Sequence, residues 1–133
     1  MKKCQNCSIC PFVENGSSVK STSTNHTIDI NTSVNCQSRN IIYCITCLNC
    51  RMQYVGESER SLQDRFSEHR GYVTHQNLTK ATGYHFNLPG HSVSDMRVTI
   101  LEKIHSSDPL VRKEREELFI RQLNTKYKGL NKK

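Results

Sequence analysis

The sequence predicts an α+β fold in which helices flank a small three-stranded antiparallel sheet, with a cysteine-rich arm at the N-terminal end. Three segments rich in β-branched and aromatic residues, 41–46, 51–56 and 96–101, predict the strands. Apolar residues recur at helical spacing over 61–71 and 109–124, which predicts the main helices. The 133 residues are about one domain's worth, so these elements are expected to share one small core.

The N-terminal arm, residues 1–39, differs in composition from the domain that we expect over 40–133. Half of residues 16–33 are Ser or Thr, and the arm has few large apolar side chains. We therefore expect a loop or an extended segment that adds little to the core, with at most a weak strand at 27–30.

A hairpin and then a helix are expected after residue 40. The stretch Cys47–Cys50 separates the first two strands closely enough for a hairpin. Ser61 followed by Asp64 resembles a capping box, which predicts the start of the first helix. Gly71 is a suitable residue for the end of that helix.

The second half of the domain begins with a weaker helix over 79–86, which the turn Pro89–Gly90 ends. The third strand follows. Asp108 and Pro109 then predict the start of the last helix, because aspartate caps helices and proline fits their first turn.

The chain carries a net charge of +7, from 19 Lys and Arg against 12 Asp and Glu. Most of this excess lies in 112–133, which has eight Lys or Arg and three Glu. A basic segment of this kind favours a polyanionic partner such as DNA, although a solvated basic end is the alternative. The lysines expected to contact phosphates are Lys126, Lys128, Lys132 and Lys133.

Two other features bear on location. No apolar run approaches the roughly 20 residues of a membrane-spanning helix, which excludes such a helix. The first residues, Met1–Cys7, include two lysines but no apolar segment typical of a signal peptide, so an intracellular location is expected.

The seven cysteines favour metal binding over disulfides, because their number is odd and the spacing Cys-x-x-Cys repeats. Two thiols and two imidazoles form a ligand set typical of structural zinc: Cys47, Cys50, His85 and His91. A second zinc site would use four thiols: Cys4, Cys7, Cys10 and Cys36. Unligated thiols are the alternative in both places, and Cys44 is expected to be a small core residue.

Several polar residues fall where packing favours apolar ones. In the first helix, Arg65 and His69 share a face with Leu62 and Phe66, which must contact the core. The alternatives are an arginine that extends to solvent from the edge of this face and a histidine that is merely hydrogen-bonded.

Glu116 is the carboxylate of the last helix that lies in line with Ile120 and Leu123, toward the sheet. An ion pair with Arg112 is the alternative, and Glu117 is expected to pair with Arg121.

Tyr43 and Tyr54 stand near strand ends, so their hydroxyls are expected to open on a shared surface. Ordinary core packing is the alternative for both.

These residues together resemble a known family. Ile41-Ile42-Tyr43, ten further residues and Tyr54-Val55-Gly56 resemble the signature of the GIY-YIG nucleases. The similarity continues through Arg65-x-x-x-His69, the segment 115–120 and Gly129-Leu130-Asn131. The segments around Asn35–Tyr43, Cys47–Cys50 and His85–Ser92 are similar to the endonuclease domain of Penelope-like retroelements. The first glycine of the signature is Ile41 here.

The resemblance implies a GIY-YIG nuclease fold and a metal-dependent DNA endonuclease. Glu116 would hold one divalent cation, Mg²⁺ or Mn²⁺, and Arg65 would bind the phosphate. Tyr43 would be the general base, with a pKa lowered by nearby cations, while Tyr54 and His69 would orient this network or share the proton. Asn131 would fix the structure near Glu116 through amide hydrogen bonds.

At the level of the cell, the resemblance implies nicking of target DNA for retroelement insertion. A reverse transcriptase in the same polyprotein would be the partner, and the location would be nuclear in a eukaryote. Two other functions remain open, a zinc-stabilised nucleic-acid-binding module without catalysis and a zinc domain that binds proteins.

Overall fold

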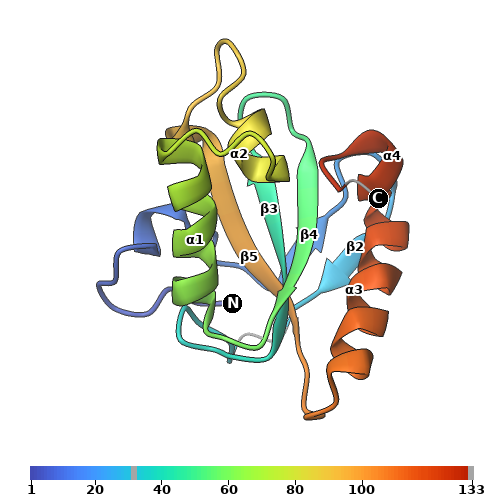
Figure 1. Ribbon diagram of the computed structural model, residues 1–133. Helices are drawn as coiled ribbons and strands as arrows, with labels where there is room; N and C mark the ends of the chain where they lie inside the picture. The colour runs from blue at the N-terminus through green and yellow to red at the C-terminus, as the bar shows by residue number, and fades with distance from the viewer. Residues whose placement is uncertain (31–32, 132–133) are drawn as a thin grey trace.

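A central antiparallel sheet organises the computed structural model, which describes residues 1–30 and 33–131. Its middle strand, β3 (Ile41–Cys47), pairs with β4 (Gln53–Ser58) on one side and β5 (Met96–Lys103) on the other (Figure 1). The predicted α+β fold with three antiparallel strands is therefore confirmed.

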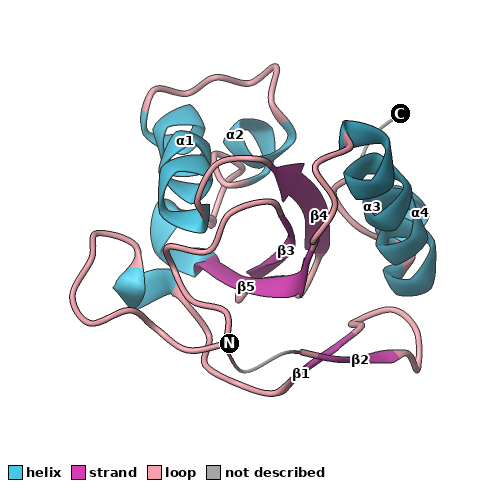
Figure 2. Ribbon diagram, turned by 90° about the horizontal axis from the view of Figure 1, so that it is seen from below, coloured by secondary structure: helices cyan, strands magenta, loops and turns pink. Residues whose placement is uncertain are grey.

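Helices lie on both sides of the sheet (Figure 2). On one side are α1 (Leu62–Thr74) and α2 (Ala81–His85), and on the other is α3 (Pro109–Leu123), followed by α4 (Thr125–Lys128). In the described part of the chain there are also two short 3-10 turns, η1 (Cys10–Phe12) and η2 (Val93–Asp95).

β3 is buried on both faces, which its nearly continuous apolar sequence explains. Tyr43 and Ile45 contribute to the cluster that includes Phe66 of α1. Ile42 and Cys44 contribute to the cluster that includes Phe119 of α3, so Cys44 is a core residue, as predicted. The period of two along the strand thus divides the core into two layers.

The first helix continues past the expected end at Gly71 to Thr74. Val73 explains this, because it extends the buried face of the helix and is itself buried. Burial of a valine outweighs the penalty of about 1 kcal/mol for a glycine inside a helix. The predicted cap is present, since the Ser61 hydroxyl accepts a hydrogen bond from the Asp64 amide at 3.2 Å.

The second strand begins at Gln53 instead of 51, because Arg51 adopts a φ of 69° in the preceding turn. The other predicted bounds differ less. The weaker helix is shorter than expected and the third strand is longer, while the last helix begins at Pro109 behind the Asp108 cap.

The arm is more ordered than its composition indicates. β1 (Ser18–Lys20) and β2 (Thr27–Asp29) form an antiparallel pair within the segment expected to be mostly loop. The expectation that the arm adds little to the core is wrong, since Ile9, Val13 and Val34 are buried in the same cluster as the sheet. Its apolar residues are few, but these three are placed where the sheet needs cover.

The C-terminal segment covers the free edge of β4. The Leu130 amide donates to the Gln53 carbonyl at 2.8 Å, and a Cβ at Gly129 would lie only 2.5 Å from that same oxygen. The Asn131 carboxamide accepts from the Val55 amide and donates to its carbonyl, both at 2.8 Å. A side chain therefore supplies the pairing that a neighbouring strand would otherwise provide.

Within residues 1–30 and 33–131, no helix has the length and apolar character needed to cross a membrane.

Candidate active site

A chain of hydrogen bonds links α1 to the middle of the sheet. The Tyr43 hydroxyl lies 2.7 Å from His69 Nε2 and accepts a hydrogen bond from Arg65 Nε at 3.1 Å. On its other side, His69 Nδ1 lies 2.8 Å from the Thr82 hydroxyl of α2. Arg65 can only donate, so the Tyr43 proton is free to point to His69, whose own proton then points to Thr82.

Burial determines the protonation states of the hydrogen-bonded residues. Tyr43 is 0% exposed and His69 is 3% exposed. Burial, together with the nearby charge of Arg65, lowers the pKa of His69 to about 3, so the imidazole is neutral at pH 7. Burial also raises the pKa of Tyr43, and the lowering that Arg65 contributes does not compensate for it.

We expected Tyr43 near the end of its strand, but it is the third residue of β3. Its ring passes over Gly56, where a Cβ would lie 2.4 Å from the phenol carbon and from its oxygen. Only a residue without a side chain can pair with Tyr43 at this point of the register, where Tyr43 faces Gly56. The glycine at the end of the signature is therefore a condition for the position of the phenol.

Tyr54 is the more accessible of the two tyrosines. It is half-buried, and its ring centroid lies 6.5 Å from that of Tyr43 and 5.4 Å from that of His69. Burial raises its pKa, and both Arg65 and Glu116 act on it electrostatically. The two phenols therefore share one side of the sheet, but only Tyr54 borders on solvent.

Arg65 connects this network to the surface. Its side chain is 23% exposed, and one terminal nitrogen lies 2.7 Å from the Glu68 carboxylate. Glu68 in turn contacts Arg60 at 2.5 Å. The guanidinium is thus oriented from two sides, by a phenol at the core and by a carboxylate at the rim.

Glu116 lies across β4 from this network, on α3, and is half-buried. Among the described residues, none forms a hydrogen bond or ion pair with its carboxylate. The alternative pairing with Arg112 does not form, because Arg112 contacts Glu57 of β4 instead. The expected pair of Glu117 with Arg121 is present at 3.8 Å.

The surroundings of Glu116 favour a cation. Burial and the nearby charge of Glu57 raise the pKa of Glu116 to about 7. Lys113 and Arg65 act in the opposite direction but do not compensate. A half-buried carboxylate without a bound partner, beside a second carboxylate, has the donor chemistry that a hard divalent cation requires.

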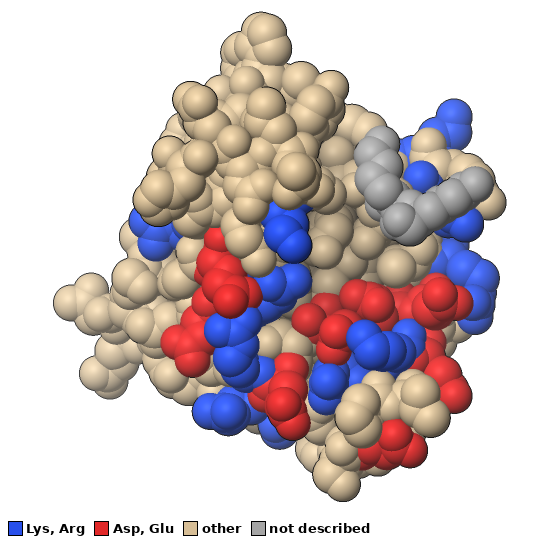
Figure 3. All heavy atoms as spheres, viewed as in Figure 1, with Lys and Arg blue, Asp and Glu red and all other residues tan. Residues whose placement is uncertain are grey.

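The groups on α1 and α3 face a common region. Glu116 and Arg65 both act electrostatically on Tyr43 and on Tyr54. Figure 3 shows side chains of both signs gathered on the surface between these two helices, while the region around α2 is largely uncharged. The fold thus brings the guanidinium of Arg65, two phenols and an imidazole to one side of the edge strand β4 and the carboxylate of Glu116 to the other.

The remaining predicted residues take other positions. Asn131 is bound to Val55 of β4, so it fixes the strand next to Tyr54 and not Glu116 directly. Lys126 and Lys128 are exposed on α4. Lys132 and Lys133 lie outside the described residues.

Three contributing residues were missed in the sequence. Glu68 follows Arg65 by three positions, so helical spacing could have identified this pair. Thr82 and Glu57 lie on other elements than their partners, and no local pattern points to them.

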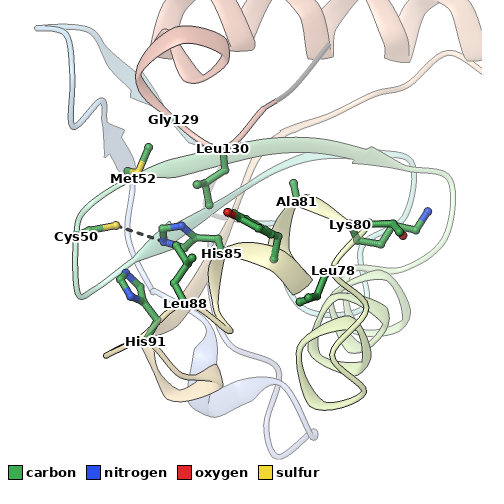
Figure 4. Close-up of a pocket in the computed structure, with 12 residues that line it drawn as sticks. Cys50, Met52, Leu78, Lys80, Ala81, His85, Leu88, His91, Gly129 and Leu130 are labelled. Atoms are coloured by element: carbon green, nitrogen blue, oxygen red, sulfur yellow. Dashed lines mark hydrogen bonds between the residues drawn. The ribbon is translucent and has the colours of Figure 1, made fainter.

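Among the described residues, two clusters of side chains that could bind a metal ion accompany this site. The predicted set Cys47, Cys50, His85 and His91 places its ligand atoms within 4.8 Å of one another. Cys50 Sγ lies 3.3 Å from His85 Nε2, and the His91 side chain interacts with the same thiol. Figure 4 shows the three side chains together. The four thiols of the arm also lie within 4.8 Å of one another.

Comparisons with known proteins agree with this arrangement. The family model described as the GIY-YIG catalytic domain matches residues 39–131. Among solved structures, the catalytic domain of the homing endonuclease I-TevI is 26% identical, with a TM-score of 0.56. The match covers 68% of this chain and 94% of that one. No curated protein matches the chain.

Proposed function

The chain belongs to the GIY-YIG catalytic domain family, and on this basis we propose that it is a metal-dependent DNA endonuclease that hydrolyses phosphodiester bonds. The observation that carries the proposal is the position of Glu116 opposite the hydrogen-bonded set of Arg65, Tyr43 and His69. The structural similarity to the catalytic domain of the homing endonuclease I-TevI supports the same activity.

Arg65 is the proposed phosphate ligand. A planar guanidinium binds two oxygens of a phosphate at once, and Tyr43 already fixes its orientation from the core side. Glu68 now contacts the outer end of Arg65 and would have to share it with the phosphate. The orientation of the Arg65 guanidinium is therefore fixed before DNA binds, which lowers the entropic penalty of binding.

Tyr43 remains the proposed general base, with His69 as the group that makes this possible. The buried phenol can accept a proton from water only if its own proton moves to His69 Nε2. The positive charge of Arg65 contributes to the low pKa of His69. A phosphate bound to Arg65 would offset that charge and raise the basicity of the imidazole. Tyr54, nearer to solvent, is the proposed residue that orients the attacking water.

Glu116 is the proposed ligand of a single Mg²⁺ or Mn²⁺ ion. One carboxylate suffices for a hard cation that keeps most of its water and also contacts phosphate oxygens. When bound, such an ion would stabilise negative charge on the phosphate and on the leaving oxygen. The exposed lysines of α4 would add phosphate contacts that do not depend on DNA sequence.

We also infer that Cys47, Cys50, His85 and His91 hold a structural zinc ion. The convergence of the four ligand atoms supports this, because both imidazoles approach the Cys50 thiol while Nδ1 of His91 faces the Pro89 carbonyl at 3.2 Å. The ion would tie the β3–β4 hairpin to α2, which also carries the Thr82 partner of His69.

The retroelement role is a finer proposal that rests on the resemblance to Penelope-like endonuclease domains. It implies single-strand nicking of target DNA, a reverse transcriptase in the same polyprotein and a nuclear location in a eukaryote. The division into an arm, 1–39, and a nuclease domain, 40–133, belongs to the same proposal. A nucleic-acid-binding module without catalysis is the competing function.

A plasmid assay tests the activity directly. Supercoiled plasmid is incubated with the protein and Mg²⁺, beside Glu116→Gln and the matched control Glu117→Gln on the exposed face of the same helix. We expect nicked circles with the wild type and the control, but not with Glu116→Gln. Linear product without a nicked intermediate would contradict the nicking proposal. Salt-sensitive DNA binding without any cleavage would favour the competing function.

A further inference from the structure

Four thiols of the arm converge outside the nuclease site. Cys10 Sγ lies 3.2 Å from the sulfur of Cys7, 3.6 Å from that of Cys4 and 3.9 Å from that of Cys36. Four sulfurs bound to one zinc ion at ~2.3 Å would lie about 3.8 Å from one another. The three distances therefore approximate the edges of a tetrahedron around an ion of that size, and all seven cysteines are free of disulfides.

Backbone amides point at two of these sulfurs. The Cys4 amide donates to Cys36 Sγ at 3.3 Å, and the Cys7 amide donates to Cys10 Sγ at 3.3 Å. Hydrogen bonds of this kind stabilise thiolates and orient metal ligands. The spacing Cys-x-x-Cys-x-x-Cys provides three ligands from one short segment, and Cys36, 26 residues beyond Cys10, completes the set.

The segments that carry these thiols also hold the start of α1. The Gln63 amide donates to the Cys36 carbonyl at 2.9 Å, and the Leu62 amide donates to the Ser38 carbonyl at 3.1 Å. These are the first two amides of the helix, which have no partner within it. The residues that follow Cys36 therefore fix where α1 begins.

A second contact holds the next turns of α1. The Phe12 ring lies 5.5 Å from the Phe66 ring, and the Arg70 guanidinium stacks 4.6 Å from the Phe12 centroid. Arg70 also donates to the Ser8 carbonyl at 3.3 Å. Ser8 and Phe12 flank Cys10, so the thiol cluster and the helix that bears Arg65 and His69 are joined at two places.

We propose that Cys4, Cys7, Cys10 and Cys36 bind one Zn²⁺ ion as a tetrathiolate, and that this ion positions α1. Binding releases the thiol protons to solvent and involves no redox step. Metal binding itself is independent of the proposed nuclease activity. Only the consequence for Arg65 and His69 rests on that function.

Metal content tests the site. Wild-type protein purified under reducing conditions should contain two zinc ions per chain, and Cys7→Ser and Cys50→Ser should each contain one. The double variant should contain none, while Cys44→Ala, which changes a buried thiol outside both clusters, should keep two. One zinc in the wild type that Cys7→Ser retains would overturn the proposal, as would iron and sulfide in place of zinc.

Cobalt substitution provides a test on the unaltered chain. Wild-type protein loaded with Co²⁺ should show thiolate-to-cobalt absorption from a four-thiolate site in addition to that of a two-thiolate site. Absorption from the two-thiolate site alone would contradict the assignment.

Hydrogen exchange tests the positioning of α1 without relying on catalysis. In Cys7→Ser the Leu62 and Gln63 amides should exchange at least about tenfold faster, while β3 amides keep the wild-type rate. Equal acceleration in both places would show general destabilisation and would overturn the positioning role. Unchanged rates in α1 would overturn it as well.

Discussion

The two sides of the candidate active site are built differently. On the α1 side, Arg65, Tyr43 and His69 are hydrogen-bonded to one another and Tyr43 and His69 are buried. On the α3 side, Glu116 is half-buried with a pKa raised to about 7 and has no hydrogen-bond partner among the described residues. The groups on the α1 side are hydrogen-bonded to one another in the protein without ligands. The carboxylate on the α3 side has no cationic partner that neutralises its charge.

This difference indicates that the two sides of the site have different roles. Groups that must have a fixed orientation gain it from the fold, through bonds that already exist. The group that we propose as the cation ligand, Glu116, has no protein partner among the described residues, and a bound arginine or lysine would compete with the metal. Substitutions should therefore have opposite effects on stability on the two sides.

The largest effect is expected for Glu116→Gln. Cleavage should fall by about a thousandfold or more, because the cation loses its only proposed carboxylate ligand. Thermal stability should be equal to or above that of the wild type, because a carboxylate without a partner is removed. Calorimetry beside the plasmid assay measures both. A large drop in melting temperature would show that Glu116 has a structural role and would contradict the proposed difference between the two sides.

The next effect is expected for Arg65→Lys on the opposite side. Lysine keeps the charge but cannot contact Tyr43 and a phosphate as a planar fork, so cleavage should fall about a hundredfold. The control Arg121→Lys, exposed on α3, should be close to wild type. Single-turnover rates on a nicking substrate check this, and an Arg65→Lys rate within threefold of the wild type would contradict the proposed fork.

Gly56→Ala should affect stability and activity together. The added Cβ would lie 2.4 Å from the Tyr43 phenol, which must move or force the strands apart. We expect a loss of about 2 kcal/mol or more in the free energy of unfolding. Gly71→Ala is the matched control, since its nearest neighbour would be 4.0 Å away and alanine favours the helix by about 1 kcal/mol. Urea denaturation of both variants measures the contrast.

The smallest effect concerns acid stability. The pKa of His69 is lowered to about 3 in the folded protein, so between pH 3 and about 6.5 the unfolded chain binds the proton more readily. Stability should therefore fall as the pH falls through this window, by up to about 1.4 kcal/mol per unit from this residue. His69→Gln should lack this contribution. Unfolding at pH 7.5 and 5.5 compares the two proteins, and identical losses would show that His69 is not a neutral buried group.

The sequence predicts a structural feature correctly where that feature depends on residues of a single helix or strand. The apolar run of β3 and the cap at Ser61 predicted a strand and a helix start that the structure contains. Helical spacing alone placed His69 on the buried face of α1. The relation of Tyr43 to Gly56 depends on strand register, which the signature alone did not reveal.

Long-range contacts account for what sequence reasoning did not find. The partner of Arg112 is Glu57 on a strand 55 positions earlier, so the local alternative with Glu116 was a wrong prediction. The average composition of the arm predicts a loop that adds little to the core, although a few side chains such as Ile9 determine its packing. Thr82 was not identified, because its role depends on how α2 is placed against α1.

Paramagnetic broadening by Mn²⁺ in amide NMR spectra tests the division of the site most directly. Low concentrations of Mn²⁺, without DNA, should broaden the signals of Glu116 and of nearby Glu57, and Glu116→Gln should abolish the effect while Glu117→Gln preserves it. Broadening that persists in Glu116→Gln, or that centres on other residues, would contradict a cation site on the α3 side.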